Sequence, residues 1–209
     1  MALDFRAFTV GPIDTNCYTL WDRNTRAAAI IDPGGDCERI ASLAASLDLR
    51  VEWILLTHGH FDHTFCAGEL AARFGARVGS HEADAAILGQ SFGIAEDFYD
   101  FSDYVQATPT DMLTDGQVIA LGESELRVIH TPGHSRGGLC FVTELGVFCG
   151  DTIFAGSIGR TDFPGGSQDQ LVESIKTKLL PLDDAVPLYP GHGPATTVGH
   201  ERRGNPYLR

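Results

Sequence analysis

The stretch Leu56-Thr57-His58-Gly59-His60-Phe61-Asp62-His63 places three of the chain's eight histidines and one acid within six consecutive positions. It directly follows an apolar run, residues 51–56, which we predict to be a buried strand. Alternate residues leaving a strand end can aim both imidazoles at one point, so His58 and His60 are suited to share one metal ion. Asp62 and His63 follow where the chain changes direction, and they can address a second ion nearby.

Three further candidate ligands stand beside glycine at the end of an apolar run. They are His134 after Thr131-Pro132-Gly133, Asp151 after Gly150, and His192 between Gly191 and Gly193. Glycine lets the backbone approach closely. Alone, each of the three would be interpreted as a loop residue, but the first cluster needs partners to fill its coordination shells. The sequence therefore predicts a metal site with seven candidate ligands: His58, His60, Asp62, His63, His134, Asp151 and His192. We expect no ligand role for His81, His130 or His200.

The composition indicates one globular domain and argues against nucleic acid and membranes as partners. The 209 residues are 43% hydrophobic and 9% aromatic, which fits one domain with a substantial core. Fifteen basic residues stand against 28 acidic ones, giving a net charge of −13. This charge repels nucleic acid and anionic membranes, and an anionic substrate would need a local basic patch. No apolar run approaches the roughly 20 residues of a membrane helix, and we expect no secretory signal at the N-terminus.

The cysteines predict a reduced protein. There are five of them, Cys17, Cys37, Cys66, Cys140 and Cys149, an odd number with no Cys-x-x-Cys pair. This pattern argues against a disulfide framework and favours a cytoplasmic location. It also excludes a cysteine-rich zinc knot, and we interpret Cys66 and Cys149 as structural thiols.

The order of the predicted elements indicates two sheets covered by helices rather than a doubly wound parallel sheet. Apolar runs and turn signals predict strands over 5–10, 17–21, 27–31, 51–56, 125–129, 138–142, 147–149 and 186–189. Helical spacing predicts helices over 37–47, 63–74, 168–180 and 195–203. The segment 89–115, which contains five aromatic residues, gives no clear pattern.

The order and spacing of Thr-His-x-His-x-Asp-His, Pro-Gly-His, Gly-Asp and a late Gly-His resemble the metallo-β-lactamase superfamily. This resemblance runs over nearly the full length and implies an α/β fold, a four-layer αββα sandwich with its site at one edge between the sheets. Residues 11–18, 154–163 and 190–194, with Glu201-Arg202 and Asn205-Pro206, resemble the short bacterial type of the glyoxalase II-like group. Full glyoxalase II enzymes carry a C-terminal helical domain that helps to hold glutathione. This chain ends soon after Asn205-Pro206, so we expect one domain over 1–209 without that addition.

The resemblance also implies a ligand scheme and an activity. His58, His60 and His134 would bind metal 1, Asp62, His63 and His192 would bind metal 2, and Asp151 would bridge them. Zinc is the first choice for such a shell, and iron or manganese also suits it. Two cations about 3.5–4 Å apart acidify a shared water. The implied activity is hydrolysis of a thioester, S-2-hydroxyacylglutathione, by a bridging hydroxide, with Asp62 as the catalytic residue that positions it.

Two residues are candidates for binding this small-molecule substrate. Arg160 is the candidate basic patch, and a salt bridge to Asp162 is the alternative role. Phe163 either lines the pocket or packs inside the fold. Two other functions stay open: a mononuclear-iron glutathione persulfide dioxygenase using His58, His134 and Asp151, and a non-catalytic protein stabilised by metal. Activity on β-lactams is a weaker candidate, and the sequence gives no indication of oligomeric state.

Overall fold

The strands of the protein form two six-stranded sheets and one two-stranded hairpin in the part of the chain that this computed structural model describes, residues 2–88, 99, 102 and 104–209. The first sheet contains, in spatial order, β1 (Leu3–Val10), β2 (Thr15–Asp22), β3 (Ala27–Ile31), β4 (Arg50–Leu55), β5 (Arg77–Ser80) and β6 (Asp111–Met112). The second contains β14 (Thr196–Thr197), β13 (Pro187–Pro190), β10 (Gly146–Gly150), β9 (Leu139–Thr143), β8 (Ser124–His130) and β7 (Val118–Leu121). The hairpin pairs β11 (Ile153–Phe154) with β12 (Ser157–Ile158).

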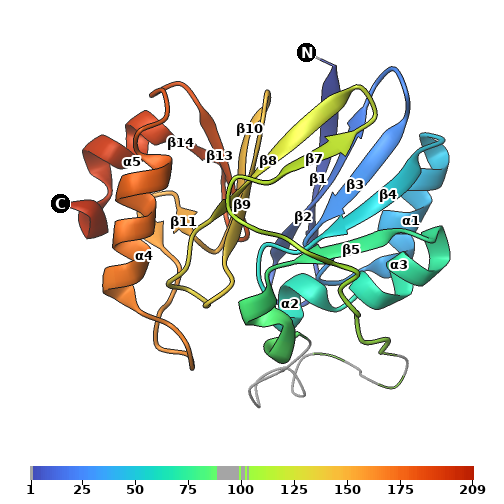
Figure 1. Ribbon diagram of the computed structural model, residues 1–209, viewed down its shortest axis with the longest axis horizontal. Helices are drawn as coiled ribbons and strands as arrows, with labels where there is room; N and C mark the ends of the chain where they lie inside the picture. The colour runs from blue at the N-terminus through green and yellow to red at the C-terminus, as the bar shows by residue number, and fades with distance from the viewer. Residues whose placement is uncertain (1, 89–98, 100–101, 103) are drawn as a thin grey trace.

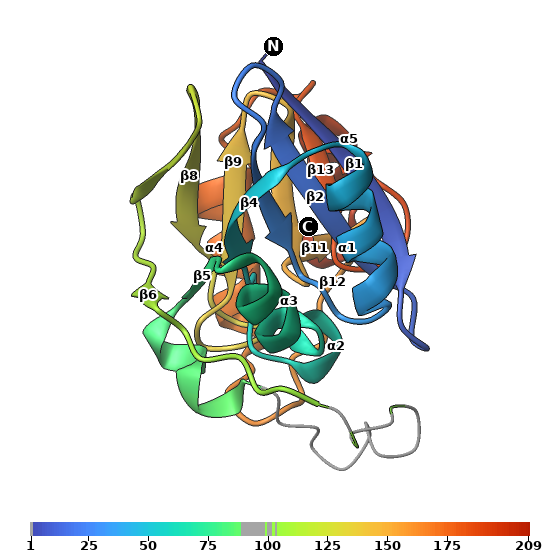
Figure 2. The ribbon, with the colours of Figure 1, turned by 90° about the vertical axis from the view of Figure 1, so that its right-hand side faces the viewer.

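Helices cover the outer face of each sheet (Figures 1 and 2). On the first sheet lie α1 (Cys37–Ser46), α2 (Phe61–Thr64) and α3 (Ala67–Phe74), followed after β5 by the 3₁₀ helix η1 (Glu82–Ile87). On the second lie α4 (Gln168–Ser174), its π-helical continuation η3 (Ile175–Leu179), α5 (Val198–Gly204) and the short η4 (Pro206–Leu208). The predicted αββα sandwich is confirmed.

Alternation along the strands explains why the sheets stack face to face. In β3, Ala27, Ala29 and Ile31 enter the apolar core between the sheets, whereas Ala28 and Ile30 pack under the helices of the first sheet. In β9, Phe141 faces the inter-sheet core and Cys140 faces the helices of the second sheet. Both faces of these strands are covered, so the side chains on both faces are mostly apolar, as is usual for sheets covered on both sides.

The segments that carry the candidate ligands meet at one edge of the sandwich. β3, β4 and β5 are parallel, so their C-terminal ends lie together beside α2, which is at the lower edge in Figure 1. Two backbone hydrogen bonds join the sheets here. The N–H of Leu139 donates to the carbonyl of Thr57 at 2.7 Å, and the N–H of Asn16 donates to that of Gly191 at 2.7 Å.

Several predicted boundaries were wrong. The helix expected over 63–74 is divided into α2 and α3, and the N–H of Cys66 donates to the carbonyl of Pro33 at this break. The helix expected over 195–203 begins only at Val198, because Thr196–Thr197 pairs with β13 as a strand. The helix expected over 168–180 becomes a π-helix at Ile175. Of the aromatic residues in 89–115, Phe92, Phe98 and Phe101 lie outside the described residues.

The prediction that the cysteines form no disulfide was also wrong. Cys37 at the start of α1 is bonded to Cys66 just before α3, with their Cα atoms 5.3 Å apart. The two residues are 29 positions apart in the chain and become neighbours because α1 and α3 cover the same face of the first sheet. The cysteine pattern therefore no longer supports the prediction of a cytoplasmic location. Among the described residues, no helix is long and apolar enough to span a membrane.

Candidate metal centre

Three imidazoles converge at the junction of the two sheets. His58 and His60 follow β4, and His134 comes from the loop between β8 and β9. Nε2 of His134 lies 3.2 Å from Nε2 of His58 and 3.0 Å from Nδ1 of His60, and all three side chains are buried. The sequence placed His134 74 residues from His60, and the fold brings them into one cluster, which we call cluster 1.

A second cluster lies beside the first and is built from Asp62, His63 and His192. Oδ2 of Asp62 is 3.3 Å from Nε2 of His63 and 3.2 Å from Nε2 of His192. Asp62 and His63 sit in α2, and His192 follows β13 from the other sheet. We call this group cluster 2.

Asp151 lies between the two clusters. Its Oδ1 is 3.4 Å from Nε2 of His63, and its Oδ2 is 3.6 Å from Nε2 of His134 and 3.8 Å from Nε2 of His192. One carboxylate therefore faces both clusters, with one oxygen nearer to each. Cluster 1, cluster 2 and Asp151 together contain all seven predicted ligands, and they lie side by side.

The donor atoms fit metal ions. At metal–nitrogen distances of about 2.0–2.1 Å, the edges of a tetrahedron are about 3.3 Å long, close to the separations of 3.0–3.3 Å within each cluster. Nε2 of His63 and Oδ1 of Asp151 are buried and have no hydrogen-bond partner in the described structure. Buried polar atoms are rarely left in this state, and a cation bound between the ligands would satisfy both. The clusters therefore form a metal site of the binuclear type.

Four of the imidazoles are oriented by a contact to the ring nitrogen that faces away from the clusters. Such partners fix the tautomer and leave the other nitrogen free as a ligand. The contacts are His58 Nδ1 with Thr57 Oγ1 at 3.1 Å, His63 Nδ1 with Asp32 Oδ2 at 2.9 Å, His134 Nδ1 with the Arg160 carbonyl at 2.7 Å, and His192 Nδ1 with the Asp14 carbonyl at 3.2 Å.

Two buried carboxylates that the sequence did not single out support the ligands. Asp32 accepts from the N–H of Thr57 at 2.7 Å and from its hydroxyl at 2.6 Å, besides contacting His63. Asp84 in η1 accepts from the N–H of Gly59 at 3.0 Å and from that of Gly137 at 2.6 Å. It thereby ties the loop of His58 and His60 to the loop of His134. In the sequence, Asp32 begins the turn signal Asp32-Pro33-Gly34-Gly35 that follows the strand predicted over 27–31. The available signal was its position at the end of the strand that precedes the histidine strand.

The histidine pKa values that are shifted move in opposite directions in the two clusters. Burial lowers the pKa of His58 well below its ordinary value, and His63 and His134 lower it further. Burial and then His134 lower the pKa of His60 to about 4. For His63, burial acts in the same direction, but the carboxylates of Asp62, Asp151 and Asp32 outweigh it and raise the pKa well above its ordinary value. The pKa of His192 is raised too, since the contacts with Asp62 and Asp151 outweigh burial.

A cavity of about 410 Å³ opens over both clusters. Its lining includes His60, Asp62, His134, Asp151 and His192, with the apolar side chains of Ile13, Phe61, Phe154, Ile158 and Phe163, and with Ser157 and Arg160. Both substrate candidates thus border the cavity. The ring of Phe163 lies edge-on to His60 with centroids 5.4 Å apart. Arg160 forms the salt bridge with Asp162 at 2.7 Å, and its guanidinium lies 3.9 Å from the centroid of Phe163.

This fold and this pair of clusters define a class of protein. The sequence model of the Metallo-beta-lactamase superfamily matches residues 10–192, so the chain belongs to this superfamily, as the motifs predicted. Together with the clusters, this membership makes it a metallo-hydrolase of the superfamily. Among curated proteins, the hydroxyacylglutathione hydrolase GloC of Haemophilus influenzae is 37% identical over 217 residues, which cover 99% of this chain and 98% of GloC.

Two solved structures show the same architecture at similar identity. The BLEG-1 B3 metallo-beta-lactamase superposes with a TM-score of 0.86 at 35% identity, covering 98% of this chain and 99% of the other. TTHA1623 in a di-iron-bound form superposes with a TM-score of 0.84 at 33% identity, covering 97% of this chain and all (100%) of the other. A relative of this similarity therefore holds two metal ions in the same fold.

Proposed function

We propose that the protein hydrolyses thioesters, with an S-2-hydroxyacylglutathione as its substrate and two divalent metal ions as cofactors. The observation that carries the proposal is the position of Asp151, one oxygen of which faces His63 and the other His134. A carboxylate between two complete ligand sets suits a pair of ions acting on one substrate. The similarity to hydroxyacylglutathione hydrolase GloC over the full length supports this choice of substrate.

When bound, two such ions would polarise the thioester carbonyl and lower the pKa of a shared water. The residues of the chain hold the geometry for this chemistry. In the proposal, Asp62 is the catalytic residue, because its Oδ2 lies between His63 and His192 and faces the cavity. Thr15 restrains the same oxygen through its hydroxyl at 3.4 Å. A thiolate is a good leaving group, so the reaction needs no dedicated acid to protonate it.

The cavity suits an acyl group that is held away from bulk water. Phe61, Phe154, Ile158 and Phe163 form apolar walls around the ligands. A water-poor site strengthens electrostatic interactions and excludes competing reactions. In the proposal, Phe163 is the wall next to cluster 1 and Phe154, whose ring centroid is 6.2 Å from that of His192, is the wall next to cluster 2.

The geometry favours this function over its rivals. A mononuclear iron centre on two histidines and one carboxylate would need only His58, His134 and Asp151. It would make no use of cluster 2, in which Asp62 lies between His63 and His192. A purely structural ion needs four ligands and no open position, whereas these clusters line an open cavity. The structural similarity to the BLEG-1 B3 metallo-beta-lactamase makes β-lactam hydrolysis the second candidate.

The test combines metal analysis with hydrolysis of S-lactoylglutathione, with and without oxygen. We expect equal rates in both atmospheres, loss of activity on chelation, and recovery with zinc, manganese or iron. Asp62→Ala should lose roughly half of the bound metal and at least ~100-fold in rate, as expected when a metal-generated nucleophile is disrupted. Asp169→Ala is the matched control, since Asp169 is exposed and does not line the cavity. Full activity of verified metal-free protein would contradict the proposal, as would oxygen uptake with glutathione persulfide in place of thioester hydrolysis.

A further inference from the structure

Besides its histidines, the lining of the cavity over the metal clusters includes one basic side chain, Arg160. Its Nε and one terminal nitrogen each lie 2.7 Å from an oxygen of Asp162, so a bidentate pair occupies that edge of the guanidinium. One flat face of the guanidinium lies over Phe163. The charge of Arg160 is therefore largely compensated within the chain. An anionic thiol carrier meeting a protein of net charge −13 needs another cation.

A second hollow, of about 270 Å³, is lined partly by residues that are neighbours in sequence of residues lining this cavity. It is lined by Ala83, Asp84, Ala86, Ile87, Arg136, Pro164 and Gly165, and we call it the η1 groove. Two of the residues that line the groove are close in sequence to residues that line the main cavity. Pro164 directly follows Phe163, and Arg136 comes two residues after His134. The loops that line the main cavity at His134 and Phe163 therefore also supply Arg136 and Pro164 to the η1 groove.

Arg136 is held in place by its backbone and stem, while its charge stays exposed. Its carbonyl lies 2.9 Å from Nε2 of His130, and the next N–H, of Gly137, donates to Asp84. A Cβ on Gly165 would be 3.3–3.6 Å from Cγ, Nε and Cδ of Arg136, so the stem lies directly against that glycine. The guanidinium forms no ion pair or hydrogen bond with any residue among 2–88, 99, 102 and 104–209.

The acid in the same groove forms no ion pair with Arg136. Both oxygens of Asp84 are already engaged, by the N–H groups of Gly59 and Gly137, and its side chain is buried. The residues outside the described part contain no Lys or Arg, so that part of the sequence supplies no competing cation. Arg136 is thus the basic group of the η1 groove.

We propose that the η1 groove is the subsite for the anionic end of the thiol carrier, and that Arg136 pairs with that anion. The proposal rests on the proposed thioester hydrolysis and adds an orientation to it. The carrier lies over cluster 1, between Phe163 and η1, and the acyl group points toward Phe154 and Ile158 beside His192. A peptide carboxylate and a nucleotide phosphate share the required chemistry, since arginine binds both in the same bidentate way.

The experiment compares thioesters that carry the same acyl group on three carriers: glutathione, coenzyme A and the uncharged thiol N-acetylcysteamine. Arg136→Gln should raise KM for the glutathione thioester about 10-fold with kcat unchanged, the result expected when a contact made equally in ground and transition state is lost. Arg136→Lys should raise this KM less than Arg136→Gln does, because lysine keeps the positive charge but lacks the planar guanidinium with its paired hydrogen-bond donors. The uncharged thioester should show no change in KM in either variant.

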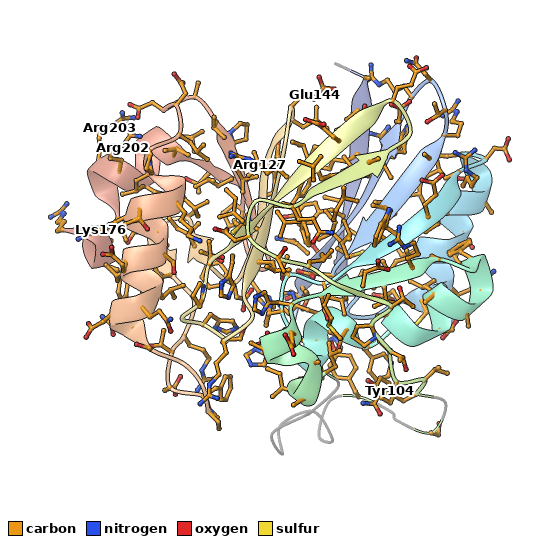
Figure 3. The ribbon with its side chains drawn as sticks, viewed as in Figure 1. Tyr104, Arg127, Glu144, Lys176, Arg202 and Arg203 are labelled. Atoms are coloured by element: carbon orange, nitrogen blue, oxygen red, sulfur yellow. A yellow bond between two sulfur atoms is a disulfide. The ribbon has the colours of Figure 1, made fainter. Side chains whose placement is uncertain are left out.

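The matched control is Arg127→Gln. Arg127 is exposed on β8, also without an ion pair among the described residues, and it lines neither the main cavity nor the η1 groove; Figure 3 shows it above the middle of the molecule. This variant makes the same change in net charge, so it should leave KM for all three thioesters unchanged. A rise in KM with Arg127→Gln would show that the effect comes from total charge and would overturn the subsite.

A binding measurement separates failure of the subsite from failure of the proposed function. Calorimetry with the uncleavable S-hexylglutathione should show about 10-fold weaker binding to Arg136→Gln than to the wild type, and the difference should shrink as salt is raised. Equal affinity of wild type and Arg136→Gln for S-hexylglutathione would overturn the subsite even if thioesters are hydrolysed. Absence of all thioester hydrolysis, with the affinity difference preserved, would overturn the function and retain the subsite. An effect with coenzyme A alone would assign the subsite to phosphate rather than carboxylate.

Discussion

Replacing Asp32 with asparagine should remove metal from cluster 2 without altering any ligand. Asp32 is buried and directs one oxygen to the N–H of Thr57, and the other to both the Thr57 hydroxyl and Nδ1 of His63. Asparagine has almost the same shape, but only one of its two terminal groups accepts hydrogen bonds. Each orientation of the amide therefore fails at one of these contacts.

The magnitude follows from those two failures. If the amide nitrogen faces Thr57 N–H, a buried backbone donor is left unpaired, at about 1–3 kcal/mol. If it faces His63, Nδ1 must become the acceptor, and the proton moves to Nε2, the nitrogen that faces Asp62 and Asp151. A protonated nitrogen cannot bind metal. Loss of such an orienting partner lowers metal affinity about 10–100-fold, and we expect Asp32→Asn to fall in this range for cluster 2.

The assay is dialysis against a graded chelator followed by metal analysis, with thermal unfolding measured in parallel. Asp22→Asn is the control, because Asp22 is equally buried and accepts from Asn24, Thr25 and Ser124 at the other end of the sandwich. This control should lower the unfolding temperature while both ions are retained. The reasoning about His63 is refuted if Asp32→Asn keeps both ions at wild-type affinity and merely unfolds earlier, as the control does.

Two further outcomes follow from the same site. In the metal-free protein, the raised pKa values of His63 and His192 mean that these imidazoles keep their protons to higher pH than His60, whose pKa is lowered to about 4, and a cation must displace those protons. The metal affinity of cluster 2 should therefore rise with pH. Calorimetry of metal binding in buffers of different ionisation enthalpy should show that cluster 2 releases more protons than cluster 1. Equal proton release at the two clusters would contradict this assignment. Gly191→Ala would place a Cβ against Oδ1 of Asp151 and 2.6 Å from Cε1 of His63, so it should cost at least ~100-fold in hydrolysis through loss of the second ion. Gly204→Ala, where a Cβ meets nothing within 4 Å, should match wild type, and an active, fully metallated Gly191→Ala would count against the close packing.

The sequence was most informative where the determinants are local. The ligands His58, His60, Asp62 and His63 are visible because they follow one strand within six positions, and β3 coincides with its predicted range because five consecutive apolar residues end at a turn. Asp32 was not recognised, because its role depends on β3 lying parallel to β4. The strands β6, β11, β12 and β14 contain two residues each, too few to show any period.

Long-range packing explains the remaining omissions. The bond between Cys37 and Cys66 depends on two helices covering the same sheet, and neither residue lies in a motif that predicts a pair. Asp84 was overlooked for a similar reason, since its partners Gly59 and Gly137 belong to loops from different sheets. In each case the sequence shows the residue, but only the fold shows which groups it meets.

The acidic surface and the metal site act on an anionic substrate in opposite senses. At long range, the net charge of −13 repels such a substrate, and salt screens this repulsion beyond a Debye length of about 10 Å at 0.1 M. Inside the site, two divalent ions would more than neutralise the carboxylates of Asp32, Asp62 and Asp151, and Arg136 adds a positive charge in the η1 groove. Attraction is therefore confined to the last few ångströms of approach. A protein built in this way selects its anion at the site itself, by contacts such as that of Arg136, and not by attraction from a distance.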